Sequence, residues 1–578
     1  MSGPRFCRLL GLATLAMTAC AAPIAGGGTS GAPSPESPRQ PSRTLVVALK
    51  SEPQTIAAGF TVGSTTSRAT PTRLFNAALD LVDDRGVARP YLAENIPQLN
   101  TETWRVLPDG TMETRYQLLP NLTWQDGAPL TADDFVFAWQ VDLIPELGLA
   151  ALPPLSEIED VQAPDSRTVA VRWKRTYPGA GVMQVGSYLR GLVPFPRHIM
   201  ERPFLEKRWD AFSAHPYWTT EFIGLGPYKL DRWEPGAFLE GVAFDGHALG
   251  RPKIDRVKIV IISDAGTALA SMLAEEIHMV ADNSIDFVQA KELKRQWASN
   301  KAGEVFASPQ AWFSIKFQLR PELANPRVLM DSRVRRAMAF GIDRKVLTDV
   351  TSEEIGMVAD TIFLPTTPYY QRIDQAITKY PYDLRRAGEL MLETGASRGP
   401  DGVLISPTDG RLTLELLSNT SPTYASQRTI IADGWRQAGF EVREGFTSNA
   451  GNDRADDSRF PGTRVSPTGL QEDNLVATFT SAAIPTPENR YSGTNTGAWS
   501  NAEFDVLANA FGGTLDPEER IGQRVRMAQI LTEEMPTIPI NWQMNPVAFV
   551  AGVTGVAPTT SPGTTGVFSW NVHEWEFR

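Results

Sequence analysis

Few residues of this 578-residue chain have types and spacing that could do chemistry. Two adjacent acid pairs, Asp133-Asp134 and Glu533-Glu534, have the composition of general acid–base pairs. Neighbouring positions of a helix point in different directions, so a helix cap or a solvated face is the favoured interpretation of both pairs.

Metal and nucleophile motifs give no stronger signal. The histidines lie at positions 198, 215, 247, 278 and 573, without metal-site spacing. The sequence contains no GxSxG and no HExxH motif. We therefore expect no catalytic residues, no metal and no cofactor. An exported hydrolase, whose acids would meet only in the folded chain, stays a remote alternative.

Cys20 has the clearest predicted chemistry, because it closes a short export signal. A start with two arginines precedes an apolar stretch from Leu9 to Met17, and two small residues come directly before Cys20. This pattern is typical of a secretory signal peptide, which is too short to span a membrane. Residues 17–20 (MTAC) resemble a bacterial lipobox, in which the cysteine thiol receives a diacylglycerol. We predict a lipoprotein signal peptide over 1–20, with an ordinary secretory signal as the alternative.

The composition after the signal indicates a tether followed by a large globular body. Residues 21–43 are rich in Gly, Pro and Ser and predict a flexible linker. If Cys7 leaves with the signal and Cys20 is acylated, no disulfide can form in the mature chain. The net charge of −11 is spread without Lys/Arg blocks, which argues against a nucleic-acid partner.

Hydrophobic patterning alternates between strand and helix periods, which predicts an α/β fold. Strands are expected over residues 44–49, 257–262, 412–417 and 440–443. Helices are expected over residues 332–346, 383–394 and 424–438.

Residues 122–137 (LTWQDGAPLTADDFVF) combine a strand end, a turn at Asp126-Gly127 and a helix N-cap at Thr131. This string resembles the signature of the family 5 extracellular solute-binding proteins, the receptors of ABC importers for peptides, opines, some oligosaccharides and nickel chelates. Further ordered matches are VPFPRHI at 193–199, GLGPYKL at 224–230, RPKIDRV at 251–257, VRRAMAFGIDR at 334–344, PYDLRRA at 381–387, WSNAEFD at 499–505 and MPTIPI at 535–540.

The resemblance implies a two-lobed, periplasmic-binding-protein-like α/β fold of the large cluster C type, with an extra small subdomain. Lobe I would comprise residues 44–75, 219–305 and 547–578, the extra subdomain 76–218 and lobe II 306–546. It also implies that a ligand lies between the lobes, which close around it by hinge motion.

The implied function is ligand capture for the permease subunits of an ABC importer. We expect an exported monomer, anchored by lipid at the periplasmic or extracytoplasmic face of the cell membrane. A peptide is the first expected ligand, because peptide binding is the commonest function in the family. The alternatives are an oligosaccharide or other non-peptide solute, and an envelope scaffold lipoprotein with the same fold.

One departure from the family pattern bears on the ligand. Peptide-binding members have an Asp before an SGTNT-like stretch, and this Asp pairs with the α-amino group of the peptide. Here no acid appears between Asn474 and Pro487, and Thr480 or Ser481 stands in that place. A hydroxyl can accept a hydrogen bond from an ammonium group but cannot neutralise it.

The remaining candidate contacts are mostly aromatic. Their rings suit peptide side chains and sugar faces alike, and burial in the core is an equally good interpretation for each. Arg490 could pair with a ligand carboxylate or phosphate. The full set of predicted ligand contacts is Phe60, Thr61, Trp312, Phe313, Thr480, Ser481, Arg490, Tyr491 and Trp542.

The lipid anchor can be tested by replacing the acylated thiol. A Cys20→Ser variant should lose acylation and yield a soluble, folded protein, because no other part of the sequence predicts membrane attachment. Cell fractionation followed by a high-salt wash measures this. Recovery of the variant in the washed membrane fraction would contradict the lipobox prediction.

Overall fold

The computed structural model describes residues 44–60, 67, 69–147, 149, 153–185, 190–352, 355–420, 422–447, 454–469, 472–557 and 568–578. The predicted signal peptide with Cys20, the linker and Thr61 lie outside these residues. Residues from Arg43 to Arg578 form one compact unit. Among the described helices, none has both the length and the apolar character needed to cross a bilayer.

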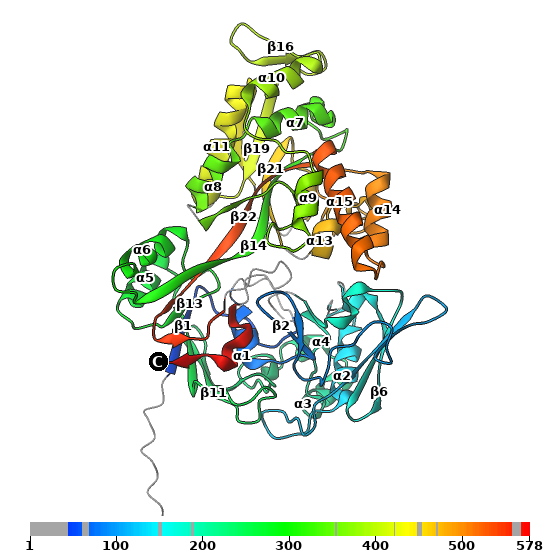
Figure 1. The fold of residues 1–578 in the computed structure, drawn as a ribbon, viewed down its shortest axis with the longest axis vertical. Coiled ribbons are helices and arrows are strands. Elements are labelled where there is room, and N and C mark those ends of the chain that lie inside the picture. Colours follow the sequence, from blue (N-terminus) through cyan, green and yellow to red (C-terminus); the bar gives the residue numbers. More distant parts are fainter. Residues whose placement is uncertain are drawn as a thin grey trace, which may run out of the picture. The chain divides into compact units, whose positions relative to one another are not determined.

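A single large sheet runs through this unit (Figure 1). In spatial order its strands are β10 (Tyr228–Glu234), β11 (Phe238–Ala243), β12 (Arg256–Ile261), β1 (Thr44–Leu49), β13 (Met279–Val280), β22 (Thr537–Val550), β14 (Gly303–Phe317), β21 (Thr463–Gly469), β19 (Thr413–Ser418) and β20 (Glu441–Phe446), with β15 (Met357–Val358) also paired to β22. Parallel and antiparallel pairs both occur, which makes the sheet mixed.

Two strands are much longer than the rest. β14 and β22 pair antiparallel from Gly303 opposite Val550 to Lys316 opposite Thr537. Figure 1 shows them side by side as one ribbon pair that joins the two ends of the sheet. Register shifts occur between Pro309 and Ala311 and between Phe313 and Ser314.

The described residues bury three hydrophobic cores. The first core surrounds β1, β12 and β13 and takes in α5 (Ala265–Leu273), α6 (Phe287–Trp297) and the end of β22 at Val547–Val550. The second core lies around the other half of the β14–β22 pair, from Trp312 to Phe317 and from Ile538 to Met544.

Helices α7 (Ser332–Phe340), α8 (Arg344–Ser352), α10 (Leu384–Glu393), α11 (Pro422–Ala438), α14 (Ala502–Phe511) and α15 (Pro517–Glu534) cover the second core. Trp435 of α11 is fully buried there, and its indole nitrogen donates to the Met338 carbonyl of α7 at 2.9 Å.

The third core packs α2 (Ala132–Asp142) on a four-stranded antiparallel sheet. The strand order of that sheet is β4 (Trp104–Val106), β5 (Met112–Gln117), β7 (Thr168–Trp173) and β6 (Ile158–Asp165). Phe135 and Trp139 of α2 face this core, whereas Phe137 and Ala138 belong to the first core. Helix α2 therefore packs against both cores and connects the small sheet to the rest of the unit.

Shorter elements complete the described chain. They are α1 (Ala69–Phe75), β2 (Asp80–Val82), β3 (Ala88–Pro90), β8 (Gln184–Val185), β9 (Arg190–Gly191), α3 (Arg197–Leu205), α4 (Trp209–Ser213), α9 (Tyr370–Ala376), β16 (Ser397–Arg398), β17 (Leu404–Ser406), β18 (Gly410–Arg411), α12 (Arg454–Ser458), α13 (Glu472–Ala477), β23 (Val553–Thr554) and β24 (Glu576–Phe577).

The structure confirms most local predictions. The first strand and the helix capped by Asp383 have the predicted bounds, and the strands predicted at 257–262, 412–417 and 440–443 are found with ends moved by one to three residues. Thr131 is the N-cap of α2, as predicted, and it also forms a capping box with Asp134. The helix predicted at 424–438 begins two residues earlier, at Pro422.

The single helix predicted over 332–346 is wrong, because two helices occupy that stretch. α7 ends at Phe340 with Gly341 as its cap, and α8 begins at Arg344. Asp343 starts the second helix, since its carboxylate accepts from the Val346 amide at 2.9 Å. The apolar spacing continues across this junction, so hydrophobic periodicity alone predicts one helix. The side-chain bond of Asp343 to the backbone starts a new helix there, and periodicity does not reveal such a bond.

The predicted lobe boundaries stay a prediction, although the cores broadly follow them. The first core also includes Val193, Phe195, Met200, Phe212, Tyr217 and Trp218, from the end of the segment predicted as the extra subdomain.

Close packing between α11 and the α7–α8 junction can be tested at Gly434. A Cβ at Gly434 would lie 2.2 Å from the Gly341 carbonyl oxygen. We expect Gly434→Ala to lower the free energy of unfolding by about 1–3 kcal/mol despite the higher helix propensity of Ala.

Chemical denaturation measures this change, and Gly522→Ala on α15 is the matched control. No atom lies within 4 Å of a Cβ at Gly522, so its replacement should be neutral or stabilising. Equal effects of the two substitutions would contradict the packing assigned to Gly434.

Candidate functional site

Polar side chains with unmet hydrogen-bonding capacity follow the β14–β22 pair. Ser308 lies directly opposite Asn545, and both are buried. Within the described part of the chain, these buried atoms have no hydrogen-bond partner: Ser308 Oγ, Trp312 Nε1, Ser314 Oγ, Asn541 Oδ1, Trp542 Nε1 and Asn545 Oδ1. Buried polar atoms in proteins are nearly always paired, so a row of exceptions on two adjacent strands needs an explanation. We call these six residues the polar strip.

The predicted aromatic contacts on these strands are all buried. Trp312 and Trp542 lie opposite each other and are both 0% exposed. The Trp312 ring meets Phe479 edge-on at 6.2 Å, and Phe313 packs on Tyr424 at 5.2 Å. Their rings belong to the second core, so only the two indole N–H groups remain available for a polar contact.

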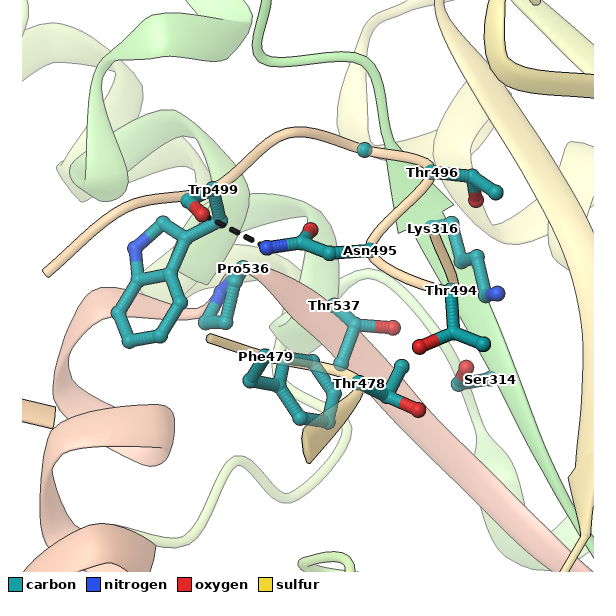
Figure 2. Close-up of a pocket in the computed structure, with 11 residues that line it drawn as sticks. Ser314, Lys316, Thr478, Phe479, Thr494, Asn495, Thr496, Trp499, Pro536 and Thr537 are labelled. Carbon is teal, nitrogen blue, oxygen red and sulfur yellow. Dashed lines mark hydrogen bonds between the residues drawn. The ribbon is translucent and has the colours of Figure 1, made fainter. Parts of the chain in front are cut away.

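A pocket adjoins the polar strip at the end of β14 (Figure 2). Water-sized groups can occupy about 20 Å³ inside it. Its walls are Ser314, Lys316, Thr478, Phe479, Thr494, Asn495, Thr496, Gly497, Trp499, Pro536 and Thr537. In Figure 2, the rings of Phe479, Trp499 and Pro536 gather on one side, and Lys316, Thr494 and Ser314 on the other.

Lys316 is the only charged residue among those walls. Burial lowers the pKa of Lys316 to about 8, and the positive charge of Arg464 adds to this effect, while Asp457 opposes it. Arg464 lies directly opposite Lys316 on β21, and Asp457 pairs with Arg464 at 2.9 Å. In the described chain, the Lys316 ammonium makes no ion pair, because the acid nearby serves Arg464.

The segment from Thr480 to Trp499, which we call the pocket loop, is held firmly by its own contacts. The Asn495 side-chain amide donates to the carbonyls of Thr480 at 3.0 Å and Trp499 at 2.8 Å. Arg320 donates to the Thr496 carbonyl at 2.9 Å and the Pro485 carbonyl at 3.1 Å. These bonds fix the wall that faces Lys316.

Two predicted contacts, Arg490 and Tyr491, lie at a strained point of the pocket loop. Their φ angles are +53° and +56°, in the left-handed region that side chains other than Gly rarely adopt. Arg490 is exposed. Tyr491 is partly buried, and its hydroxyl accepts a hydrogen bond from Arg459 at 2.9 Å. Neither residue lines the pocket beside Lys316.

The two hydroxyls predicted to replace the family's acid are used within the chain. Thr480 Oγ1 donates to the Ala477 carbonyl at 2.9 Å. Ser481 donates to Asp505 through both its hydroxyl and its amide, the latter at 2.9 Å. Neither hydroxyl borders the pocket, which is lined instead by Thr478 and Phe479 of the same segment.

The predicted contact Phe60, in the loop after the first strand, lies in the first core. Phe60 is 2% exposed, and its ring stacks on Trp218 with centroids 3.8 Å apart. Its neighbour Thr61 falls outside the described residues. In this conformation Phe60 contacts other side chains of the protein.

Sequence reasoning missed Ser308, Lys316, Asn541 and Asn545. The available signal was the polar residues in two otherwise apolar strand patterns, SPQAWFSIKF at 308–317 and INWQMNPVAF at 540–549. Alternation alone predicts a solvated face for such residues. Only the pairing of the strands shows that both faces are covered.

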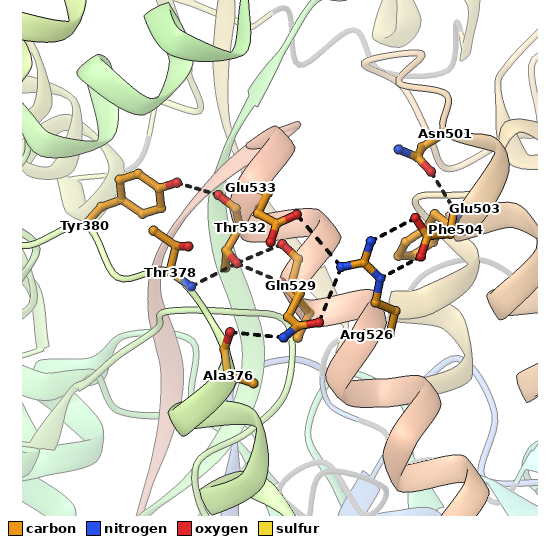
Figure 3. Close-up of polar contacts among 11 residues, drawn as sticks. Ala376, Thr378, Tyr380, Asn501, Glu503, Phe504, Arg526, Gln529, Thr532 and Glu533 are labelled. Atoms are coloured by element: carbon orange, nitrogen blue, oxygen red, sulfur yellow. Dashed lines mark hydrogen bonds and ion pairs between the residues drawn. The ribbon is translucent and has the colours of Figure 1, made fainter.

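The acid pairs have structural roles. Asp134 caps α2, and Asp133 is exposed, which confirms the favoured interpretation of that pair. Figure 3 shows Arg526 of α15 paired with Glu503 of α14 at 2.6 and 2.9 Å, with Glu533 3.9 Å away.

Among the residues that the structure describes, no group of three or more His, Cys, Asp or Glu side chains could hold a metal ion.

Comparison with known proteins now identifies the class. The family model for bacterial extracellular solute-binding proteins, family 5 (middle), matches residues 94–481. The oligopeptide-binding protein AppA of Bacillus subtilis (strain 168) is 24% identical over 332 residues, which cover 56% of this chain and 55% of AppA. The chain thus spans about half the length of curated relatives such as AppA.

Solved structures resemble almost the whole chain. The oligopeptide-binding protein of Thermus thermophilus, complexed with a pentapeptide, has a TM-score of 0.71 at 22% identity, over 92% of this chain and 96% of that one. NikZ of Campylobacter jejuni, in complex with Ni(L-His), has a TM-score of 0.72 at 20% identity, over 93% and 100%.

The fold is the mixed α/β, two-lobed fold of these binding proteins, as the sequence predicted. The chain belongs to the bacterial extracellular solute-binding proteins of family 5. This is a family of substrate-binding transport proteins and not of enzymes.

The unpaired charge at Lys316 has a testable effect on stability. The pKa in the folded chain, about 8, lies below the ordinary value of 10.5, so the unfolded chain binds more protons between these two pH values. The protonated group therefore costs stability below pH 8, and this cost disappears as the pH rises towards 10.5. We expect Lys316→Met to raise the free energy of unfolding at pH 7 by on the order of 2–3 kcal/mol, with little gain above about pH 10.5.

Denaturant unfolding across this pH range measures the gain. Lys345→Met is the control, because the Lys345 side chain is 81% exposed and its replacement removes the same charge. A Lys316→Met protein that is less stable than wild type at pH 7 would show that the ammonium has a structural partner.

Proposed function

We propose that the chain is an exported, lipid-anchored receptor that captures a peptide and delivers it to the permease subunits of an ABC importer. Cys20 would carry the anchor at the extracytoplasmic face of the cell membrane. Membership of a solute-binding family supports capture and transport. The peptide assignment draws on the relative AppA and on a structural neighbour complexed with a pentapeptide.

The single observation that carries the proposal is the polar strip. Its free groups are of both kinds, with indole N–H donors at Trp312 and Trp542 and side-chain carbonyl acceptors at Asn541 and Asn545. Successive residues of a strand point to opposite faces, so the Trp312 and Trp542 donors lie on one face of the pair and the Asn541 acceptor on the other. A peptide main chain offers both donors and acceptors, so it is chemically matched to the groups on either face. The strip lies where β14 and β22 pass from the first core to the second.

Hinge motion would act at the same place. Only β14 and β22 continue from the first core into the second within the described sheet. One register shift of the pair lies in its middle part, at Pro309–Ala311, and the other nearer its Lys316 end, at Phe313–Ser314. A ligand that satisfies the buried groups there would favour the closed arrangement of the lobes, because it bonds to the hinge strands themselves. The importer would then recognise the closed state.

A glycan, another small solute or a scaffold role without a ligand would fit the same fold. A metal chelate has no dedicated histidine cluster among the described residues. The peptide proposal is preferred because the strip offers both donors and acceptors and contains no charged side chain.

Native mass spectrometry of the gently purified full chain tests the proposal. We expect added masses that differ by amino-acid residue increments, because main-chain contacts hold many sequences. One discrete mass of a glycan would replace the peptide assignment, and a protein without added mass would favour the scaffold role.

Asn545→Leu should reduce the bound fraction without loss of stability, since it removes an unpaired buried carbonyl.

A further inference from the structure

The pocket at the end of β14 has an excess of hydrogen-bond donors and positive charge. Its walls contain one cation, Lys316, and no carboxylate. Ser314 and Thr496 also line it, and neither of their buried hydroxyls has a partner among the described residues. Lys316 is partly buried, and an ammonium in such a place without a direct ion pair costs free energy, to which the two unpaired hydroxyls beside it add.

The charged residues around Lys316 increase the excess of positive charge at the pocket. Arg464 lies directly opposite on β21, and like charges at directly opposed positions of a sheet repel. Asp457 of α12 offsets Arg464, to which it is bonded at 2.9 Å. The charges that act on Lys316 are therefore the cation Arg464 and the anion Asp457, and because Asp457 is bonded to Arg464, it compensates the charge of Lys316 only in part.

We propose that this pocket receives an anionic group of the ligand, a carboxylate in the first place, and that Lys316 neutralises it. The inference rests on the proposed function, because it assigns the anion to the captured ligand. Lys316, Ser314 and Thr496 would donate to the anion's oxygens. Phe479, Trp499 and Pro536 on the facing wall would cover a short apolar group next to the anion (Figure 2).

The fit of size and charge favours an anionic end over a cationic one. The space inside the pocket that water-sized groups can occupy is about 20 Å³, which suits one small polar end group of a larger ligand and not a whole ligand. A free α-amino group placed here would meet the Lys316 ammonium and no acid. The receptor would thus favour ligands with an acidic end and a blocked or absent ammonium group at this position.

Four probes and two variants test the inference with the full-chain protein. The probes are N-acetyl-trialanine, its C-terminal amide, sodium acetate and sodium phosphate. Calorimetric titration should give N-acetyl-trialanine an affinity about tenfold or more above that of its amide. Lys316→Met should abolish this difference, while Lys345→Met, which removes an exposed charge, should preserve it.

The small anions separate this inference from the peptide proposal. At equal ionic strength, acetate should raise the melting temperature of wild type and of Lys345→Met above the value in chloride, but not that of Lys316→Met. If acetate raises the melting temperature in this way but no peptide binds, the anion pocket is upheld and the peptide proposal is rejected. A larger shift with phosphate than with acetate would assign the anion to a phosphate ester. Equal shifts in wild type and Lys316→Met, or equal affinities for the acid and its amide, would overturn the inference.

Discussion

The antiparallel pairing of β14 with β22 is the constraint on which the rest of the structure depends. No other described strands continue from the first core into the second, so their shared hydrogen-bond ladder joins the two halves of the sheet. The ladder is interrupted at Pro309–Ala311 and Phe313–Ser314. Such irregularities turn side chains away from their regular alternation and bend a strand pair locally. The joining element is therefore also the place where polar groups gather.

These polar groups work against stability. Ser308, Asn541 and Asn545 each bury an unpaired oxygen, and Lys316 holds a charge whose pKa is lowered by burial. The pocket loop adds backbone strain at Arg490 and Tyr491. Proteins retain local conflicts of this kind mainly at functional sites, where a ligand supplies the missing partner. The unpaired atoms of β14 and β22 extend from Ser308 to the pocket at the end of β14, and others, such as those of Asp80 and Gln184, lie elsewhere in the described chain.

Short-range features of the fold were predictable because their causes are local. The caps at Thr131 and Asp383 and the strand at 44–49 depend on residues within one turn or one alternation of each other. The helix predicted at 332–346 failed at Asp343, where a side chain bonded to the Val346 amide begins a second helix. Thr480 and Ser481 stay predicted ligand contacts, and in this structure their hydroxyls donate to Ala477 and Asp505.

The sequence by itself determined the family, the α/β class and the predicted export signal, because each of these can be recognised from short contiguous segments of the chain. It also showed that the usual acid of the ligand segment is missing. Only the tertiary structure decided that Lys316 has no counter-ion among the described residues, that Ser308 faces Asn545, and that Trp312 and Trp542 are core residues with free N–H groups. The pairing of β14 with β22 joins strands more than 200 residues apart in the chain, and Lys316 meets Arg464 across a second pairing, with β21. No local pattern records which side chains such pairings will cover.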